Sequence, residues 1–82
     1  MAHPEFIQKG FDKALAHLVE ETGEVLAAIG KTQRYGAMSV NPLLPPEEQE
    51  TNLDWLRREL DDLKGAISRL EIEIETNFGH EL

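Results

Sequence analysis

The residues best suited to chemistry in this chain are two pairs of acids, each pair three residues apart. Glu21 and Glu24 form the first pair, preceded by Glu20, and Glu59 and Asp62 form the second. Residues at positions i and i+3 share one face of a helix, so each pair presents two carboxylates to the same place. Hard cations such as Mg²⁺ take oxygen ligands of this kind. The spacing therefore predicts a divalent-cation site of a type that neutralises a polyphosphate.

Two amphipathic helices are predicted to position these acids, over residues 4–31 and 51–78, with a connection over residues 32–50. Apolar residues recur at steps of three and four in both segments, which is typical of a helix with one apolar face. The stripes consist of Phe11, Leu15, Leu18, Val25 and Ile29, with Thr22 in step, and of Leu53, Leu56, Leu60, Leu63, Ile67, Leu70 and Ile74. Thr51 followed by Asp54 predicts a capped start of the second helix, and Gly30 or Gly36 the end of the first. In the connection, the prolines interrupt regular structure and residues 46–49 predict a short helical turn.

These elements predict one all-α domain over residues 1–82, built as an antiparallel helical hairpin. Two helices alone cannot enclose a wide apolar face. We therefore expect two hairpins to associate into a four-helix bundle, which makes the protein a homo-oligomer, either a dimer or a tetramer.

In such a hairpin the two acidic pairs lie at nearly the same level. Glu21 and Glu24 are about 9 to 14 Å from the end of the first helix, and Glu59 and Asp62 are about 12 to 17 Å from the start of the second. Each acid comes one position before a stripe residue, so the pairs are predicted to flank the seam between the helices. An alternative is that the acids are solvated helix faces whose ion-pair partners are nearby basic residues. Those partners are Arg57, Arg58 and Lys64.

Composition restricts the classes of function. The chain has 82 residues, no cysteine and a formal net charge of -8. The negative charge disfavours binding to a nucleic acid polymer. No segment predicts a signal peptide or a membrane span, and the lack of cysteine is compatible with a reducing compartment. We expect a cytoplasmic protein without a membrane partner.

Both helices resemble those of the MazG-like, all-α nucleoside triphosphate pyrophosphohydrolases. Residues 17–28, HLVEETGEVLAA, are similar to the EExxE helix of that family, and residues 58–63, RELDDL, to its ExxD helix. The similarity covers about residues 13–70, with the motifs in the family's order. It implies a four-helix bundle of MazG-like type, and hydrolysis of a (deoxy)nucleoside triphosphate to monophosphate and pyrophosphate with Mg²⁺, for which Mn²⁺ is a possible substitute.

The resemblance assigns roles to the individual acids. Glu21, Glu24, Glu59 and Asp62 correspond to the family's metal ligands. Glu20 matches the first acid of EExxE and is a candidate for orienting the attacking water, so that Glu20 and Glu21 are the candidates for catalytic roles. Larger relatives have four helices per subunit, whereas this chain has room for two long ones, so base-recognition residues cannot be transferred.

Four further residues are candidates for binding the substrate. Lys31, Arg34 and Lys64 could hold phosphates, or could simply be solvated. Trp55 lies four residues before Glu59 and either stacks on a base or packs against the apolar stripe. His17, four residues before Glu21, could orient that carboxylate.

The competing function is a non-catalytic helical oligomer that acts as an interaction module or as a nucleotide-binding regulatory module.

Overall fold

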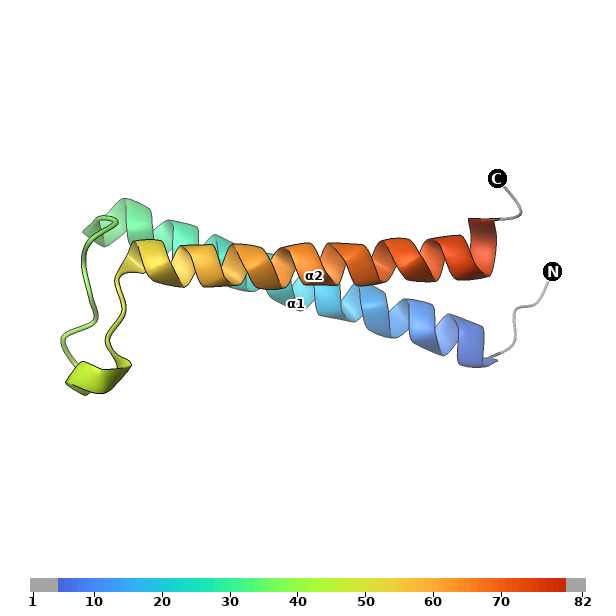
Figure 1. Ribbon diagram of the computed structural model, residues 1–82, viewed down its shortest axis with the longest axis horizontal. Coiled ribbons are helices and arrows are strands. Elements are labelled where there is room, and N and C mark those ends of the chain that lie inside the picture. Colours follow the sequence, from blue (N-terminus) through green and yellow to red (C-terminus); the bar gives the residue numbers. More distant parts are fainter. Residues whose placement is uncertain (1–4, 80–82) are drawn as a thin grey trace.

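The computed structural model describes residues 5–79, with side chains from residue 10 onward, and shows two long helices packed side by side. Helix α1 spans Glu5–Tyr35, the short 3₁₀ helix η1 spans Pro46–Glu48, and helix α2 spans Asn52–Phe78. The helices run antiparallel and cross at a shallow angle, with the connection at one end and the start of α1 and the end of α2 at the other (Figure 1). The predicted all-α hairpin is confirmed within the described residues; the predicted start at Pro4 lies outside them.

Helix α1 continues to Tyr35, which is four residues beyond the predicted end at Lys31. It stops at Gly36, whose φ of 95° is a left-handed conformation that residues with a Cβ rarely adopt. The amide of Gly36 donates to the carbonyl of Thr32 at 2.9 Å and closes the last turn. Of the two glycines predicted to end this helix, Gly36 is therefore the one that does, and Gly30 lies within it.

The start of α2 is fixed by its cap and by the end of α1. The Thr51 hydroxyl accepts a hydrogen bond from the amide of Asp54 at 3.1 Å, which confirms the predicted cap. The Asn52 side-chain amide donates to the carbonyl of Gly36 at 3.0 Å, and the Asn52 backbone amide donates to the carbonyl of Ser39 at 2.9 Å. The two helix ends are thus tied directly to each other, and this tie sets the level at which residues of α1 and α2 meet.

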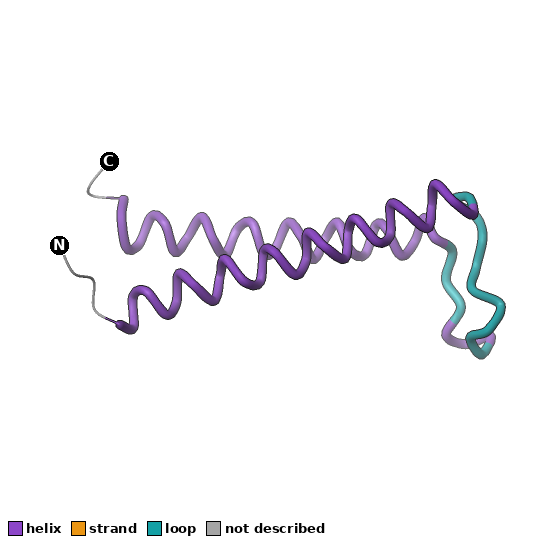
Figure 2. The backbone as a smooth tube through the Cα atoms, turned by 180° about the vertical axis from the view of Figure 1, so that it is seen from behind, coloured by secondary structure: helices purple, strands orange, loops and turns teal. Residues whose placement is uncertain are grey.

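The connection leaves the helix axis as an arm and returns, as the tube in Figure 2 shows from behind. It contains η1, the short helical turn expected over residues 46–49. At the opposite end of the hairpin the rings of Phe11 and Phe78 meet edge to face, with centroids 5.3 Å apart. The molecule is a rod of 53 × 22 × 18 Å, in which side-chain contacts join the two helices at both ends.

The most fully buried residues of the seam between the helices are mainly small or acidic, and the larger side chains of the apolar stripe are less completely buried. Ala14, Ala28 and Ala66 are fully buried, Val25 is nearly so, and Glu59 is only 3% exposed. The prediction that both acidic pairs flank the seam is therefore wrong for Glu59, which lies inside it. Small side chains allow the two helices to approach closely. Ala14, Ala28, Glu59 and Ala66 each lie one position before a stripe residue, whereas Val25 and the half-buried Leu56, Leu63 and Leu70 belong to the stripe. Each helix is therefore turned from the predicted packing by less than one position, which is less than about 100°.

That rotation leaves a row of large apolar side chains along α2 incompletely covered. Leu53, Leu60, Ile67 and Ile74, which we call the apolar row, recur every seven residues and are between 37% and 41% exposed. On α1, Leu15 and Ile29 have similar exposure. Spacing by seven keeps side chains on one side of a helix that packs against another helix.

Among the described residues, neither long helix has the length and hydropathy that a bilayer-spanning segment requires.

Candidate metal centre

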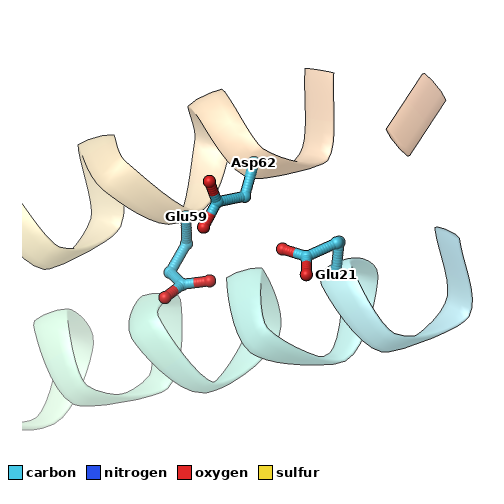
Figure 3. A group of neighbouring side chains, drawn as sticks. All are labelled: Glu21, Glu59 and Asp62. Atoms are coloured by element: carbon cyan, nitrogen blue, oxygen red, sulfur yellow. The ribbon is translucent and has the colours of Figure 1, made fainter. Parts of the chain in front are cut away.

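Three of the four predicted metal ligands meet between the helices. Glu21 extends from α1 and Glu59 and Asp62 from α2, and their carboxylates converge in the space between the two ribbons (Figure 3). One oxygen from each of these residues, which we call the acid group, lies within 4.8 Å of the other two. Glu59 is buried, Glu21 is half-buried and Asp62 is exposed, so the group is open to solvent on one side.

The Glu59 carboxylate has two donors on one oxygen and no donor on the other. Its Oε1 accepts from the indole Nε1 of Trp55 at 3.2 Å and from Nη1 of Arg58 at 3.0 Å. Its Oε2 is buried and has no hydrogen-bond partner among the described residues. A buried carboxylate oxygen without a donor is unfavourable, because it has lost water and gained nothing in exchange.

Within the described part of the chain, the Glu21 carboxylate on the other helix shares the unpartnered buried oxygen but not the two donors. Its Oε2 is also buried and without a partner among the residues the structure describes. Its Oε1 lies 3.8 Å from Nε2 of His17, and Nδ1 of the same ring lies 3.3 Å from Nη1 of Arg69. His17 therefore stands between Glu21 and a guanidinium on α2. At 3.8 Å its ring is too far from Glu21 for a hydrogen bond, so its role in orienting that carboxylate stays a prediction.

Glu24, the fourth predicted ligand, is exposed and does not belong to the acid group. It does interact with that group, because a protonated Glu24 can donate a hydrogen bond to Glu59. This hydrogen bond, followed by repulsion from the charge on Glu59 and then by smaller effects that include Glu21 and Glu20, raises the pKa of Glu24 above its ordinary value. When both carboxyls are ionised they can only accept hydrogen bonds. A proton on Glu24 and a cation beside Glu59 would therefore both offset the negative charge of Glu59.

The raised pKa of Glu24 predicts how the stability of the metal-free protein depends on pH. A group whose pKa is higher in the folded state binds more protons there, so the free energy of unfolding falls as the pH rises through the interval between the two pKa values. The interval begins at the ordinary value of 4.5 and ends at the raised value. Urea unfolding with EDTA, repeated across this interval, should show a fall for the wild type that Glu24→Gln reduces.

Asp12→Asn is the matched control for this measurement, since Asp12 is an exposed acid on the same helix. It removes the same charge outside the acid group. If Glu24→Gln and Asp12→Asn change the pH dependence equally, the coupling between Glu24 and Glu59 is not its cause.

The acid group fits a small divalent cation in chemistry and nearly in size. Around Mg²⁺, with oxygen ligands at about 2.1 Å, neighbouring oxygens are roughly 3 Å apart and opposite ones roughly 4.2 Å apart. The separations of up to 4.8 Å exceed these values by about an ångström or two at most. Two buried oxygens without donors are what a cation would satisfy, so the donor set is suited to Mg²⁺ or Mn²⁺.

The other predicted site residues are distributed around this group. Glu20 is exposed and reaches the site only through its charge on Glu24. Lys31 and Arg34 place their cationic ends 5.5 and 5.8 Å from the ring centroid of Tyr35, in cation–π geometry. Lys64 is exposed, and no contact links it to the acid group in the part of the chain that the structure describes.

Trp55 has a role that neither sequence interpretation included. Both base stacking and packing were considered, but its indole donates to Glu59, so it orients a buried carboxylate. The four-residue spacing between Trp55 and Glu59 was visible in the sequence. What could not be seen was that Glu59 would be buried and would need a donor.

Arg58 is the functional candidate that sequence reasoning missed, since it was considered only as a partner for solvated acids. It contacts Glu59 in the seam and also Glu50 in the connection, where Nη2 lies 2.7 Å from Oε1. The hydrogen bond to Glu50 is the main cause of the raised pKa of the Arg58 guanidinium. The signal for this role was its place directly before Glu59.

A half-open surface pocket of about 810 Å³, which we call the cavity, lies between the connection and the adjoining helix ends. Its wall includes Trp55 and Arg58, the two residues that donate to Glu59. The cavity is therefore adjacent to the acid group on the side of Glu59. Lys31 and Tyr35 line it from α1. Arg34, by contrast, is not part of its wall among the described residues.

Comparison of this chain with protein-family models, with curated proteins and with solved structures finds no match.

Proposed function

We propose that this chain is a Mg²⁺-dependent nucleotide pyrophosphohydrolase, which converts a nucleoside or deoxynucleoside triphosphate to the monophosphate and pyrophosphate. The observation that carries this proposal is the acid group, in which Glu21 and Glu59 each have a buried oxygen without a donor. Mg²⁺ held there would offset the negative charge of a substrate's phosphates. The reaction class comes from the resemblance of the two helices to the MazG-like enzymes.

The position of the cavity supports a nucleotide as the substrate. A nucleotide has a planar, partly apolar base that is joined through a sugar to a phosphate chain, so its site needs an apolar recess close to cationic groups. The cavity is lined by the aromatic side chains of Trp55 and Tyr35 and by several aliphatic ones, and also by the cationic side chains of Lys31 and Arg58. In this proposal the nucleoside lies in the cavity and the phosphates extend toward the acid group, with Glu20 or Glu21 orienting the attacking water.

A panel of nucleoside and deoxynucleoside triphosphates with Mg²⁺, assayed separately for pyrophosphate and orthophosphate, tests this function. The expected products are pyrophosphate and a monophosphate in equal amounts. Release of orthophosphate would indicate attack at a different phosphorus. Absence of both products in a protein that still binds Mg²⁺ would favour a nucleotide-binding module without turnover.

The working form in this proposal is an assembly of at least two chains. The apolar row and the partly exposed Leu15 and Ile29 present apolar surface from both helices. A second copy of the hairpin offers the same surface, and self-complementary contact about a twofold axis would bury both copies at once. Heptad spacing along the row is the pattern that packs in a four-helix bundle.

Ile67→Glu is predicted to weaken this association by at least about tenfold in dissociation constant, because it places an unpaired charge in an apolar contact. Sedimentation velocity across a dilution series measures the effect. Ser68→Glu is the control, since it adds the same charge at the next residue, which is exposed and away from the apolar row. Equal behaviour of the two variants, or a wild type that is monomeric at micromolar concentration, contradicts the proposed assembly.

A non-catalytic helical oligomer is the second candidate, and the length of the apolar row is the observation that favours it. The row extends from Leu53 to Ile74 and therefore continues well past the acid group. A protein whose task is assembly alone would keep the oligomer when the acid group is altered and would show no response to divalent cations. The two candidates therefore differ in the metal experiments described below.

A further inference from the structure

The Arg58 side chain joins the acid group to the connection. Its Nη1 lies 3.0 Å from Oε1 of Glu59, which belongs to the candidate metal centre, and its Nη2 lies 2.7 Å from Oε1 of Glu50, in the connection. The two terminal nitrogens of one guanidinium therefore hold two different carboxylates. Glu59 is buried and comes from the same helix as Arg58, whereas Glu50 precedes the Thr51 cap and lies at the wall of the cavity.

The contact with Glu50 is the more replaceable of the two. The Arg58 side chain is 54% exposed and the Glu50 side chain is 39% exposed, whereas the Glu59 side chain is only 4% exposed. Ion pairs between exposed side chains contribute little to stability, because water and salt screen them. A phosphate carries more charge than a carboxylate and offers several acceptor oxygens in a geometry that matches a guanidinium. An anionic phosphate that enters the cavity can therefore displace Glu50 from Nη2.

The side chains around the contact between Arg58 and Glu50 favour the binding of an anion such as phosphate. The whole chain has a net charge of -8, yet the cavity wall carries the cationic side chains of Lys31 and Arg58 against the single acidic side chain of Glu50. Arg58 also lies next to the acid group, which is where the phosphates lie in the proposed function.

We infer that Arg58 is a phosphate-binding residue and that Glu50 is an internal competitor, whose carboxylate occupies the place on the guanidinium that a phosphate of the ligand takes. The identification of the ligand as a polyphosphate rests on the proposed function, whereas the competition at Arg58 rests on the geometry alone.

Calorimetric titration with inorganic tripolyphosphate, in saturating Mg²⁺, tests this inference on four forms of the full chain. Glu50→Gln should tighten binding by about two- to fivefold, which is the factor that corresponds to an exposed ion pair. Arg58→Ala should weaken binding by about tenfold or more, as expected for a lost charge-assisted hydrogen bond. In the double variant, Glu50→Gln should have no further effect, since the competitor acts only through Arg58.

Glu48→Gln is the matched control, because Glu48 is an exposed acid of the same connection and its side chain has no ion-pair or hydrogen-bond partner among the described residues. It makes the same change in net charge. The inference is overturned if Glu50→Gln has no effect, if Glu48→Gln tightens binding as much, if Arg58→Ala binds like the wild type, or if the wild type shows no saturable binding.

A separate titration of the same proteins with Mn²⁺ alone distinguishes this failure from failure of the proposed function. Mn²⁺ binding together with tripolyphosphate binding that is insensitive to Glu50 would leave the metal centre in place and remove the role of Arg58. If the four forms bind tripolyphosphate with the predicted differences in affinity but none of them binds Mn²⁺, the role of Arg58 is kept and the metal centre is removed. Circular dichroism confirms that each variant keeps the helices on which the comparison depends.

Discussion

Glu59→Gln is expected to reduce pyrophosphate release by at least about 100-fold and, at the same time, to leave the metal-free protein as stable as the wild type or more stable. Loss of activity follows because an amide replaces a charged metal ligand, and even residues that only support such ligands cost about 10- to 100-fold when changed. Stability is retained because glutamine keeps an oxygen that accepts from Trp55 and Arg58, while repulsion between Glu59 and the acids around it disappears.

The opposite signs of the two effects make this variant informative. Asp62→Asn should show a similar loss of activity, since Asp62 belongs to the same acid group. Asp61→Asn is the control, because Asp61 is exposed, lies next to Asp62 in the chain and stays outside that group. Turnover of Glu59→Gln at the wild-type rate, or a metal-free melting temperature well below that of the wild type, would show that Glu59 is a structural residue and not a ligand.

Addition of Mg²⁺ is expected to raise the melting temperature of the wild type by roughly 10 °C or more when its concentration is about 100 times the dissociation constant. A ligand that binds only the folded state stabilises it by about 2.7 kcal/mol at that concentration. In a domain of this size each kcal/mol corresponds to about 4 to 8 °C. Thermal unfolding followed by circular dichroism in EDTA, and then in increasing Mg²⁺ or Mn²⁺, measures the shift.

Charge screening has to be separated from specific binding in this experiment, because a chain with a net charge of -8 gains stability from any added salt. NaCl at the same ionic strength is the reference for the wild type. Glu59→Gln is the reference protein, since it keeps most of the negative charge and loses a ligand. A shift of equal size in NaCl, or in Glu59→Gln, would mean that no specific cation site exists.

Much of the fold could be predicted from local sequence patterns. The apolar periodicity predicted both helices, Thr51 and Asp54 predicted the cap of α2, and the level of each acidic pair followed from helical rise alone. These features depend on residues close together in the sequence. The end of α1 was uncertain between Gly30 and Gly36 because either glycine can follow a last turn, and only the fit of the connection decides between them.

The orientation of the helices about their axes could not be predicted. Each helix has two neighbouring surfaces, one with large apolar residues and one with alanines and acids, and the sequence does not state which packs within the hairpin. The structure places Ala14, Ala28 and Ala66 in the seam and leaves the apolar row on an adjoining face. If the proposed association is correct, the large side chains pack between chains, where burial is not visible in a single hairpin.

Within the candidate site, sequence reasoning identified acids but not the residues that serve them. Glu21, Glu59 and Asp62 could be selected by spacing because helical geometry brings i and i+3 together. The contact between Arg58 and Glu50 depends on the path of a 16-residue connection from Gly36 to Thr51, which no periodic pattern encodes. Glu24 was assigned with the others by spacing, yet it lies outside the acid group because burial differs between neighbouring positions of α1.

The most direct test of the shared cation is a crystal grown or soaked with Mn²⁺ and measured for anomalous scattering. We predict one strong peak between the helices, within about 2.0 to 2.4 Å of carboxylate oxygens from Glu21, Glu59 and Asp62. Two results would contradict the metal centre and the function proposed from it. One is a crystal soaked in saturating Mn²⁺ that has no anomalous peak among these three side chains, and the other is a structure in which Glu21 points away from Glu59.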